Sequence, residues 1–375
     1  MKPKVLFVMH MPPPVHGAAA VGASVRQSET INQAYQCYYV NPNTSHELAH
    51  VGRLTWYKLA EIWRLFWHIR REIRCIQPDL VYFTPNTTGF PFLKDFILLQ
   101  GMRSAGRKIV LHFHNKGVST HRGHPLYHWL YKRYFAGVKV ILLAQDLYAD
   151  VKDYVSQDRV FICPNGIAPQ QVQPAAEKAQ HSVPQLLFLS NMMRTKGVWE
   201  LLQALELLKE RGIAFHCHFV GGWKDITPDA FQQAVCQKGL QQVVTAHGPQ
   251  YGADKLPFWQ QADLFVFPSH TEAFPLVVLE AMEQQVPVLS TRVGGVGGAI
   301  EHGVSGWLIG GEQAILDNNY AASPQELAQA LEKLLASPQL REQLAQAAYT
   351  RFKNQFTLSA FLERFQEAID WALEK

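Results

Sequence analysis

The chain has 375 residues, of which 47% are apolar and 18% are charged, a composition that excludes intrinsic disorder. Its length predicts two or three domains. The sequence contains no stretch of 18 or more apolar residues, so no membrane-spanning helix is predicted. The net charge of +4 hides an asymmetry, because residues 1–165 hold 20 Lys and Arg against 10 Asp and Glu, whereas residues 166–375 hold 15 against 21. A basic half favours anionic partners such as membrane surfaces, phosphorylated lipids or nucleic acids.

Short apolar runs alternate with helical patterns along the whole chain. The first run, residues 5–9, is too short for a secretory signal and predicts a buried strand. Alternation of this kind predicts parallel sheets with crossover helices. It occurs on both sides of the Pro- and Gln-rich segment 168–184, which has no apolar period and predicts a linker. Further strands are expected at 80–83, 109–113, 138–143, 186–189, 214–220, 264–267 and 286–289.

Residues 53–76 predict an amphipathic helix that carries six Lys or Arg against two Glu. Either this helix packs on a core and exposes a solvated basic face, or it lies in a membrane interface. The positive charge of the whole first half favours the membrane. The apolar stripe comprises Trp56, Leu59, Ile62, Trp63, Phe66, Trp67, Ile69 and Ile73.

The segment SNMMRTKG at 190–197 joins a predicted strand to a helical pattern over 198–211. Free amides at a helix N-terminus, together with Arg194 and Lys196, would bind a diphosphate. A solvated basic turn accounts for the same residues equally well. The chain contains no Walker A sequence.

Two glutamates, Glu272 and Glu280, follow the predicted strand at 264–267. Pro275 suits the first position of a helix, so Glu272 is expected in the loop before that helix and Glu280 within it. Carboxylates at this edge of a sheet can accept hydrogen bonds from sugar hydroxyls. Alternatively, Glu272 caps the helix and Glu280 lies on its solvated face.

The glycine run at 294–298 would let backbone approach a ligand closely, but neither it nor the loop after the first strand is a dinucleotide fingerprint. The sequence has no D-x-D, and its close histidine pairs lack a carboxylate cluster, so we expect no bound metal, although residues 46–50 (HELAH) do match H-E-x-x-H. His114 differs from the other histidines because it follows a predicted strand; it is either an active-site group or a structural histidine. The five cysteines form no C-x-x-C pair and predict reduced thiols in a cytoplasmic protein.

Taken in order, these motifs resemble the retaining glycosyltransferases of family 4, which have the GT-B fold, of the type that builds bacterial cell-surface polysaccharides. The resemblance spans nearly the whole chain and is densest from 186 to 308. It rests on His16-Gly17, His114, PNGI at 164–167, Arg194, Lys196-Gly197, GG at 221–222, PSHTEAFPLVVLEAM at 268–282 with the pair Glu272 and Glu280, VPV at 286–288, GG at 294–295 and GVSGWL at 303–308.

The resemblance implies an α/β protein with two doubly wound Rossmann-like domains that face each other across a cleft. Residues 1–167 would form an N-terminal acceptor-binding domain, on which a helix at about 356–375 packs back. Residues 168–355 would form the C-terminal domain that binds a nucleotide sugar.

The resemblance also implies roles for individual residues. Arg194 and Lys196 would neutralise the donor diphosphate, and Glu280 would take the ribose hydroxyls. The catalytic residues would be Glu272, which holds the transferred sugar, and His114, close to the anomeric carbon. The remaining donor-binding residues would be Gly17, Asn191, Gly197, Phe274 and Leu276. The chain departs from the family at Ser190-Asn191, where Gly-Arg is common, and at 294–298, where Gly-Gly-x-Pro-Glu is common.

The implied activity is transfer of a hexose-type sugar from a nucleotide sugar, with a UDP-sugar favoured, to a glycan or lipid-linked saccharide, with retention of configuration. No metal or other cofactor is expected. The expected partners are the donor, the acceptor and an anionic membrane surface, but no nucleic acid. The expected location is the cytoplasm or the inner face of the plasma membrane. The alternatives are a non-catalytic GT-B scaffold that binds a glycolipid or partner enzyme, and a nucleotide-dependent epimerase or dehydrogenase.

Overall fold

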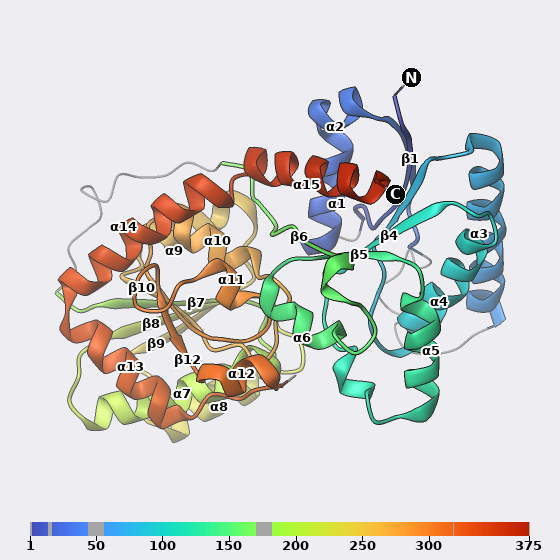
Figure 1. Cartoon of the computed structure of the whole chain (residues 1–375). Helices are drawn as coiled ribbons and strands as arrows, with labels where there is room; N and C mark the ends of the chain where they lie inside the picture. Colours follow the sequence, from blue (N-terminus) through green and yellow to red (C-terminus); the bar gives the residue numbers. More distant parts are fainter. Residues whose placement is uncertain (1, 14–16, 44–55, 170–181, 318, 375) are drawn as a thin grey trace. The chain divides into compact units, whose positions relative to one another are not determined.

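The computed structural model describes residues 2–13, 17–43, 56–169, 182–317 and 319–374 (Figure 1). The chain divides into two compact units, Met1–Asn165 with Leu358–Lys375, and Gly166–Thr357. The sequence analysis places these divisions at 167/168 and near 356. Most of the predicted linker, residues 170–181, lies outside the described residues.

The first unit is built on a six-stranded parallel sheet with the order β2-β1-β3-β4-β5-β6. Its strands are β1 (Lys4–Val8), β2 (Gln36–Val40), β3 (Leu80–Phe83), β4 (Lys108–His112), β5 (Lys139–Leu142) and β6 (Val160–Ile162). Its helices are α1 (Gly17–Gln27), α2 (Glu29–Ala34), α3 (Trp56–Ile76), α4 (Gly89–Arg103), α5 (Pro125–Phe135), α6 (Tyr148–Val151) and α15 (Leu358–Leu373), with short 3-10 turns η2 (Ser119–His121), η3 (Gln145–Leu147) and η4 (Gln157–Arg159).

The second unit repeats this plan with the order β12-β11-β10-β7-β8-β9, again parallel throughout. Its strands are β7 (Gln185–Leu189), β8 (His216–Val220), β9 (Val244–Gly248), β10 (Leu264–Phe267), β11 (Val288–Thr291) and β12 (Trp307–Ile309). Its helices are α7 (Val198–Glu210), α8 (Pro228–Gln237), α9 (Leu256–Gln261), α10 (Leu276–Glu283), α11 (Val296–Ala299), α12 (Gly311–Leu316), α13 (Pro324–Ala336) and α14 (Pro338–Gln355), with 3-10 turns η6 (Arg194–Lys196) and η7 (Gly252–Lys255).

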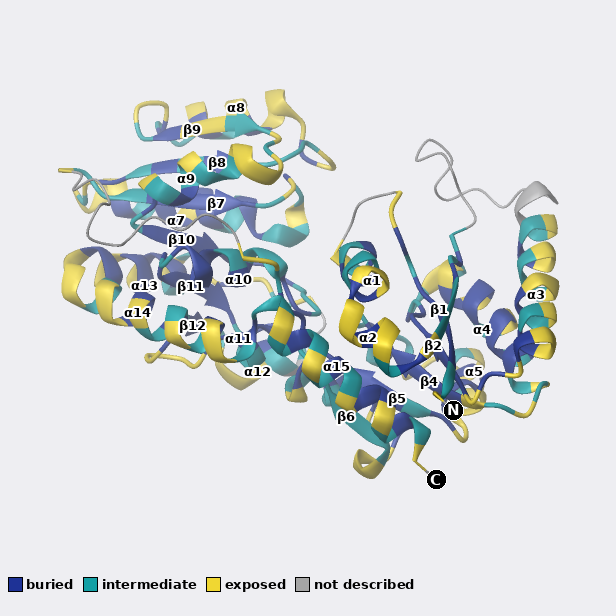
Figure 2. Cartoon of the chain, turned by 90° about the horizontal axis from the view of Figure 1, so that it is seen from above, coloured by how far each residue is buried: buried dark blue, intermediate teal, exposed yellow. Residues whose placement is uncertain are grey.

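The central strands of both sheets are continuous apolar runs because helices cover both faces of each sheet (Figures 1 and 2). Every residue of β3, β10 and β11 is buried. The predicted α/β class with two doubly wound domains is therefore confirmed. The final helix α15 completes the first core, since Phe365 packs against Phe7 and Tyr82.

Two points of the sequence analysis need correction, and a third prediction extends beyond the described residues. The strands that the apolar runs did not reveal are β2, β6, β9 and β12, which are the outer strands of the two sheets and are only partly buried. Pro275 is the N-cap residue of α10 rather than its first helical residue. The helix predicted over 53–76 begins at Trp56, and residues 53–55 lie outside the described residues.

Both interpretations of α3 describe part of this helix. Ile62, Ile69 and Ile73 are buried in the first unit, whereas Trp63 and Trp67 are each 55% exposed. The side chain of Trp56 lies outside the described residues. Among the described helices, none combines the length and low polarity needed to cross a bilayer.

Candidate functional site

The strand order of the second sheet reverses between β7 and β10, and the predicted motif loops follow these two strands. In open parallel sheets this reversal leaves a crevice outside the carboxyl ends of the strands, where ligands bind. The two loops are in backbone contact, because the amide of His270 donates to the carbonyl of Thr195 at 2.9 Å. Gly197 has φ 75°, and a Cβ atom there would overlap the carbonyl oxygen of Pro268, so this close approach requires glycine.

Lys196 and Glu272 form an ion pair across these loops. The Lys196 Nζ lies 2.5 Å from Glu272 Oε1, and the hydroxyl of Ser269 donates to the same oxygen at 2.8 Å. The side chains of Lys196 and Glu272 are 23% and 11% exposed, so both are partly shielded from water but open to a ligand. The sequence predicted the two residues for one site, and the structure brings them into direct contact.

A second lysine–glutamate pair was not predicted. Lys255 ends the turn η7 after β9, and its Nζ lies 2.6 Å from Glu280 Oε1 and 2.5 Å from Glu280 Oε2. The two side chains are 15% and 14% exposed. No sequence motif marks Lys255, because its partner is 25 residues away in the chain and on another element.

The glycine loop after β11 packs against the loop that carries Glu272. A Cβ atom at Gly295 would overlap the carbonyl of Ala273 and press on the ring of Phe274. Phe274 is 5% exposed, and Leu276 is the first residue of α10. The backbone amides at a helix N-terminus can donate to an anionic or hydroxylated ligand, although that of Val278 already donates to the carbonyl of Pro275.

Asn191 and Arg194 lie in the loop after β7, and both side chains are exposed. The backbone amide of Arg194 donates to Asp225 Oδ1 at 3.1 Å, which fixes the start of the turn η6. Among the described residues, no carboxylate is ion-paired with the Arg194 guanidinium, in contrast to Lys196. The turn therefore presents one paired and one solvent-facing cation before the N-terminus of α7.

His114 and Gly17 belong to the first unit. Gly17 is the exposed first residue of α1, and His114 follows β4. The His114 ring lies 4.2 Å from that of His112, between centroids, and His112 Nδ1 is hydrogen-bonded to the Tyr82 hydroxyl at 2.7 Å. Burial lowers the pKa of His112 well below its usual value, with a further contribution from His114, so His112 is a neutral structural histidine at pH 7.

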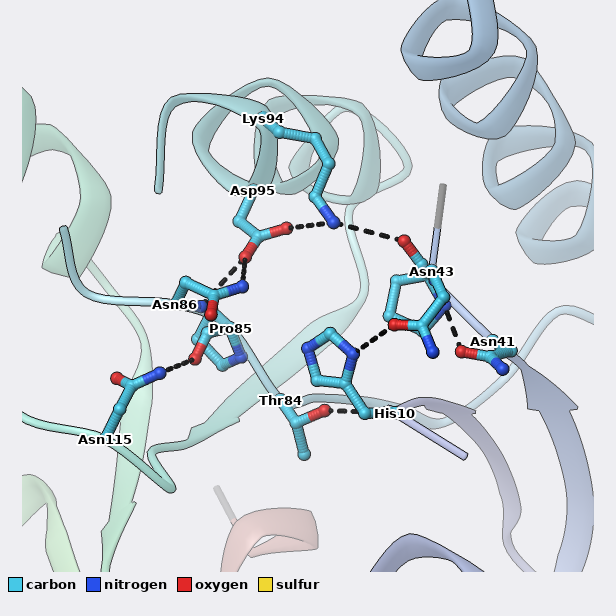
Figure 3. Close-up of polar contacts among 10 residues, drawn as sticks. His10, Asn41, Asn43, Thr84, Pro85, Asn86, Lys94, Asp95 and Asn115 are labelled. Atoms are coloured by element: carbon cyan, nitrogen blue, oxygen red, sulfur yellow. Dashed lines mark hydrogen bonds and ion pairs between the residues drawn. The ribbon is translucent and has the colours of Figure 1, made fainter. Parts of the chain in front are cut away.

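The first sheet also reverses its strand order, between β1 and β3, and a polar network lies at this point (Figure 3). The amide of His10, after β1, donates to the Thr84 hydroxyl, after β3, at 3.2 Å. His10 Nδ1 is 2.6 Å from Asn43 Oδ1, in the loop after β2. Asn43 also lines a pocket of about 200 Å³ with Glu61, Arg64, Leu65 and His68 of α3.

A buried ion pair on α4 supports this network. Lys94 and Asp95 are 7% and 1% exposed, and Lys94 Nζ lies 3.4 Å from Asp95 Oδ1. Lys94 donates to the carbonyl of Pro42 at 3.1 Å, and Asp95 Oδ2 accepts two 2.8 Å hydrogen bonds from the backbone and side-chain amides of Asn86 (Figure 3). The pair thus anchors the loops after β2 and β3.

In the parts of the chain that the structure describes, no three His, Cys, Asp or Glu side chains are placed to hold a metal ion. His216, His218 and His247 lie close together, but His218 Nδ1 is already hydrogen-bonded to His247 Nε2 at 2.9 Å.

The paired charges lie in the part of the chain that matches a known family. Residues 169–351 match the family model of Glycosyl transferases group 1. Most of the second unit is therefore similar to group 1 glycosyltransferases. The GT-B resemblance inferred from the motifs is therefore supported at the level of this family.

Curated relatives match a little over half of the chain. The chain is 31% identical over 225 residues to a D-inositol 3-phosphate glycosyltransferase of Arthrobacter. The matched region covers 57% of this chain and 51% of the relative. It is 26% identical over 224 residues to the amylovoran biosynthesis glycosyltransferase AmsK of Erwinia amylovora, covering 58% and 53%. The chain thus spans about half the length of the curated relatives it matches.

Solved structures match the whole fold. A glycosyltransferase from Rickettsia africae superposes with a TM-score of 0.71 at 16% identity, covering 100% of this chain and 99% of that one. Anabaena HepE in complex with UDP superposes with a TM-score of 0.70 at 16% identity, covering 98% and 99%. These similarities show that both units share the GT-B fold.

The second unit brings together most of the residues predicted to bind the donor. Gly197 and Phe274 hold the loops together, while Lys196, Glu272 and Glu280 supply the charges. The roles assigned to these residues, and to Asn191, Arg194 and Leu276, remain predictions. So do the roles of His114 and Gly17 in the first unit.

Proposed function

We propose that the chain is a retaining glycosyltransferase that moves a hexose-type sugar from a nucleotide sugar, with a UDP-sugar favoured, to a saccharide or lipid-linked saccharide. The observation that carries this proposal is the two lysine–glutamate contacts of the second unit, one of which joins the loops at its switch point. Lysines suit a diphosphate and carboxylates suit ribose and sugar hydroxyls, so the two pairs supply the kinds of group that a nucleotide sugar needs. The UDP complex of the similarly folded HepE supports the choice of base.

Breaking the bond between the anomeric carbon and the phosphate oxygen places negative charge on the leaving diphosphate. Lys196, Arg194 and the N-terminal end of α7 would stabilise this charge without a metal ion. Lys196 already pairs with Glu272, so the cation is in position before the donor arrives. Glu272 would hold the transferred sugar, and Glu280 would hold the ribose.

For retention, the acceptor hydroxyl would attack the face of the sugar that the diphosphate leaves. The new bond joins the acceptor oxygen to the anomeric carbon, and the hydroxyl proton passes to the departing phosphate oxygen. His114 of the first unit would contact the sugar near this carbon. The bonds formed and broken balance, so the reaction needs neither a redox partner nor a covalent enzyme intermediate.

The acceptor site would lie in the first unit, at the polar network of Figure 3 and the adjoining pocket on α3. Amide, hydroxyl and charged groups at the switch point suit a hydroxylated saccharide. AmsK and the colanic acid glycosyltransferase WcaL of Escherichia coli, which is 26% identical over 61% of this chain, are both named for polysaccharide biosynthesis. These names favour a growing saccharide as the acceptor.

The first unit would dock on the anionic inner face of the plasma membrane. Most of the large apolar side chains exposed in the described residues lie on α3, α4 and α5. Two of the exposed tryptophans each have an arginine over the ring: Arg70 lies over Trp67, and Arg133 lies over Trp129. Tryptophan and arginine side by side are typical of membrane interfaces. The exposed apolar residues of these helices are Trp63, Trp67, Leu93, Ile97, Leu126 and Trp129.

The transfer reaction is tested by incubating the protein with UDP-hexoses and a pool of lipid-linked saccharides, followed by mass spectrometry and NMR of the product. The proposal predicts a product that is one hexose heavier and has the anomeric configuration of the donor. An inverted product would refute retention. A folded protein that transfers no sugar from any nucleotide sugar would favour the scaffold alternative.

A further inference from the structure

We propose that Lys255 is a positioning residue of the donor site, which orients the Glu280 carboxylate so that it accepts hydrogen bonds from the ribose hydroxyls. This inference rests on the proposed donor role of Glu280 and adds a residue that no motif identifies. It concerns how the nucleotide is bound rather than the transfer chemistry.

The contact geometry supports orientation rather than simple attraction. A carboxylate on a helix can rotate about its terminal bond, so a lysine that touches one oxygen leaves the plane free. Lys255 Nζ touches both oxygens of Glu280, at 2.6 and 2.5 Å, and so restricts this rotation. A carboxylate has about four lone-pair positions, so two remain for hydroxyl donors after Lys255 has taken two.

Burial makes this contact stronger than an ordinary surface ion pair. The side chains of Lys255 and Glu280 are 15% and 14% exposed, whereas the Lys238–Glu206 pair of the same unit, also at 2.5 Å, is 23% and 32% exposed. Exposed ion pairs contribute little because water screens them. The pair at Glu280 is also anchored from two separate elements, η7 and α10.

Charge balance gives Lys255 a second effect. A nucleoside diphosphate carries negative charge, and two carboxylates, Glu272 and Glu280, lie along its proposed path. Each would repel the phosphates unless neutralised, and like charges a few ångströms apart interact strongly where water is partly excluded. Lys196 neutralises the first carboxylate and Lys255 the second, so the site can hold hydroxyl acceptors next to an anion.

A purely structural role for Lys255, tying η7 to α10, makes a different prediction. It would weaken all ligands alike or lower stability. An orienting role acts only through the ribose hydroxyls that Glu280 binds, so it is visible as a loss of discrimination between a ribonucleotide and its 2′-deoxy counterpart.

The test is calorimetric titration of UDP and 2′-deoxy-UDP into wild type, Lys255→Met and Lys255→Arg. One hydrogen bond to a charged group corresponds to roughly tenfold or more in affinity, so the wild type should prefer UDP by at least about tenfold. Lys255→Met should lose most of this preference. Both nucleotides should bind more weakly, because Glu280 is no longer neutralised, but UDP should lose about tenfold more affinity than 2′-deoxy-UDP. Lys255→Arg, which keeps the charge, should recover part of the preference.

Lys238→Met removes the comparable pair outside the site and should leave both affinities unchanged. The proposal is overturned if Lys255→Met weakens both nucleotides equally while the protein remains folded, or if it keeps the wild-type preference. It is also overturned if the wild type binds both nucleotides equally well, which would remove the ribose role of Glu280. If the wild type binds none of UDP, ADP and GDP, the proposed donor site itself is refuted. This outcome differs from those above, in which a nucleotide binds but the role of Lys255 fails.

Discussion

The two sheets have the same parallel architecture, but their switch points carry different chemistry. At the second sheet, two lysine–glutamate pairs line the loops after β7, β9 and β10. At the first sheet, hydroxyl, amide and imidazole groups form a network over the buried pair of Lys94 and Asp95 (Figure 3). The comparison shows that one fold plan can present charges to a charged ligand and neutral polar groups to a hydroxylated one.

The two ion pairs nearest the switch points also differ in what they contact. Lys94 is 7% exposed and donates to a loop carbonyl, so it serves the folded state. Lys196 is 23% exposed and pairs with a carboxylate that is 11% exposed, and the proposed function assigns it to donor binding. Substitutions of the two lysines should therefore have different consequences.

Lys196→Ala should have the largest effect on activity. It should weaken nucleotide-sugar binding at least about tenfold, because hydrogen bonds to charged groups contribute roughly 1.5–3 kcal/mol each. Transfer should be nearly abolished, since the lost cation also faces the charge that develops on the leaving group. Calorimetry and a transfer assay measure the two effects, with Lys209→Ala, on the outer end of α7, as the control. Unchanged donor affinity would contradict the role of Lys196.

Lys94→Met should instead damage the fold of the first unit. Removing one partner of a buried ion pair costs about 3–5 kcal/mol, because Asp95 would remain charged and unpaired. Urea unfolding followed by the fluorescence of the first unit's tryptophans measures this loss. The exposed Lys132→Met on α5 should change stability by less than about 0.5 kcal/mol. Equal stability of the two variants would show that the Lys94 pair has no structural role.

Charge reversal on α3 should remove membrane binding. Each Lys or Arg near an anionic bilayer contributes about 1 kcal/mol, so Arg70, Arg71 and Arg74 changed to Glu should abolish co-sedimentation with phosphatidylserine-containing vesicles. Binding of the wild type should also fall as salt rises, because the Debye length is only about 8 Å at physiological ionic strength and shorter above it.

A matched triple reversal in the second unit, at Lys209, Arg211 and Lys353, changes the net charge equally and should leave vesicle binding largely intact. If the α3 variant sediments as well as the wild type, or the wild type ignores anionic vesicles at low salt, α3 is only a core element. The acceptor would then be a soluble saccharide.

Removal of divalent metal should have the smallest effect. The proposed mechanism assigns the diphosphate to Lys196, Arg194 and a helix N-terminus, so transfer should survive EDTA at the wild-type rate. The assay compares EDTA-treated and untreated protein, each with and without added manganese. Inactivation by chelator with rescue by manganese would overturn this account of the diphosphate site.

The comparison also explains what could be predicted from the sequence. The central strands were found because they are fully buried and therefore continuously apolar, as at Leu80–Phe83 and Leu264–Phe267. The outer strands β2, β6, β9 and β12 were missed because they are only partly buried and lack that pattern.

The same contrast applies to the sites. Lys196 stands in one short contiguous motif, and Glu272 and Glu280 stand in another, so each motif can be recognised from its own segment of sequence. Lys255 and the network of His10, Thr84 and Asn43 are joined only by folding, because their partners are 25 to 74 residues apart. Parallel topology brings such residues to one edge of the sheet, and short sequence patterns do not record that proximity.

The most direct test of the central claim is a crystal structure of the protein with UDP. The account predicts the diphosphate within hydrogen-bonding distance of Lys196 Nζ and the ribose hydroxyls on Glu280, beside Lys255. UDP bound elsewhere on the second unit, or at the polar network of the first unit alone, would contradict it.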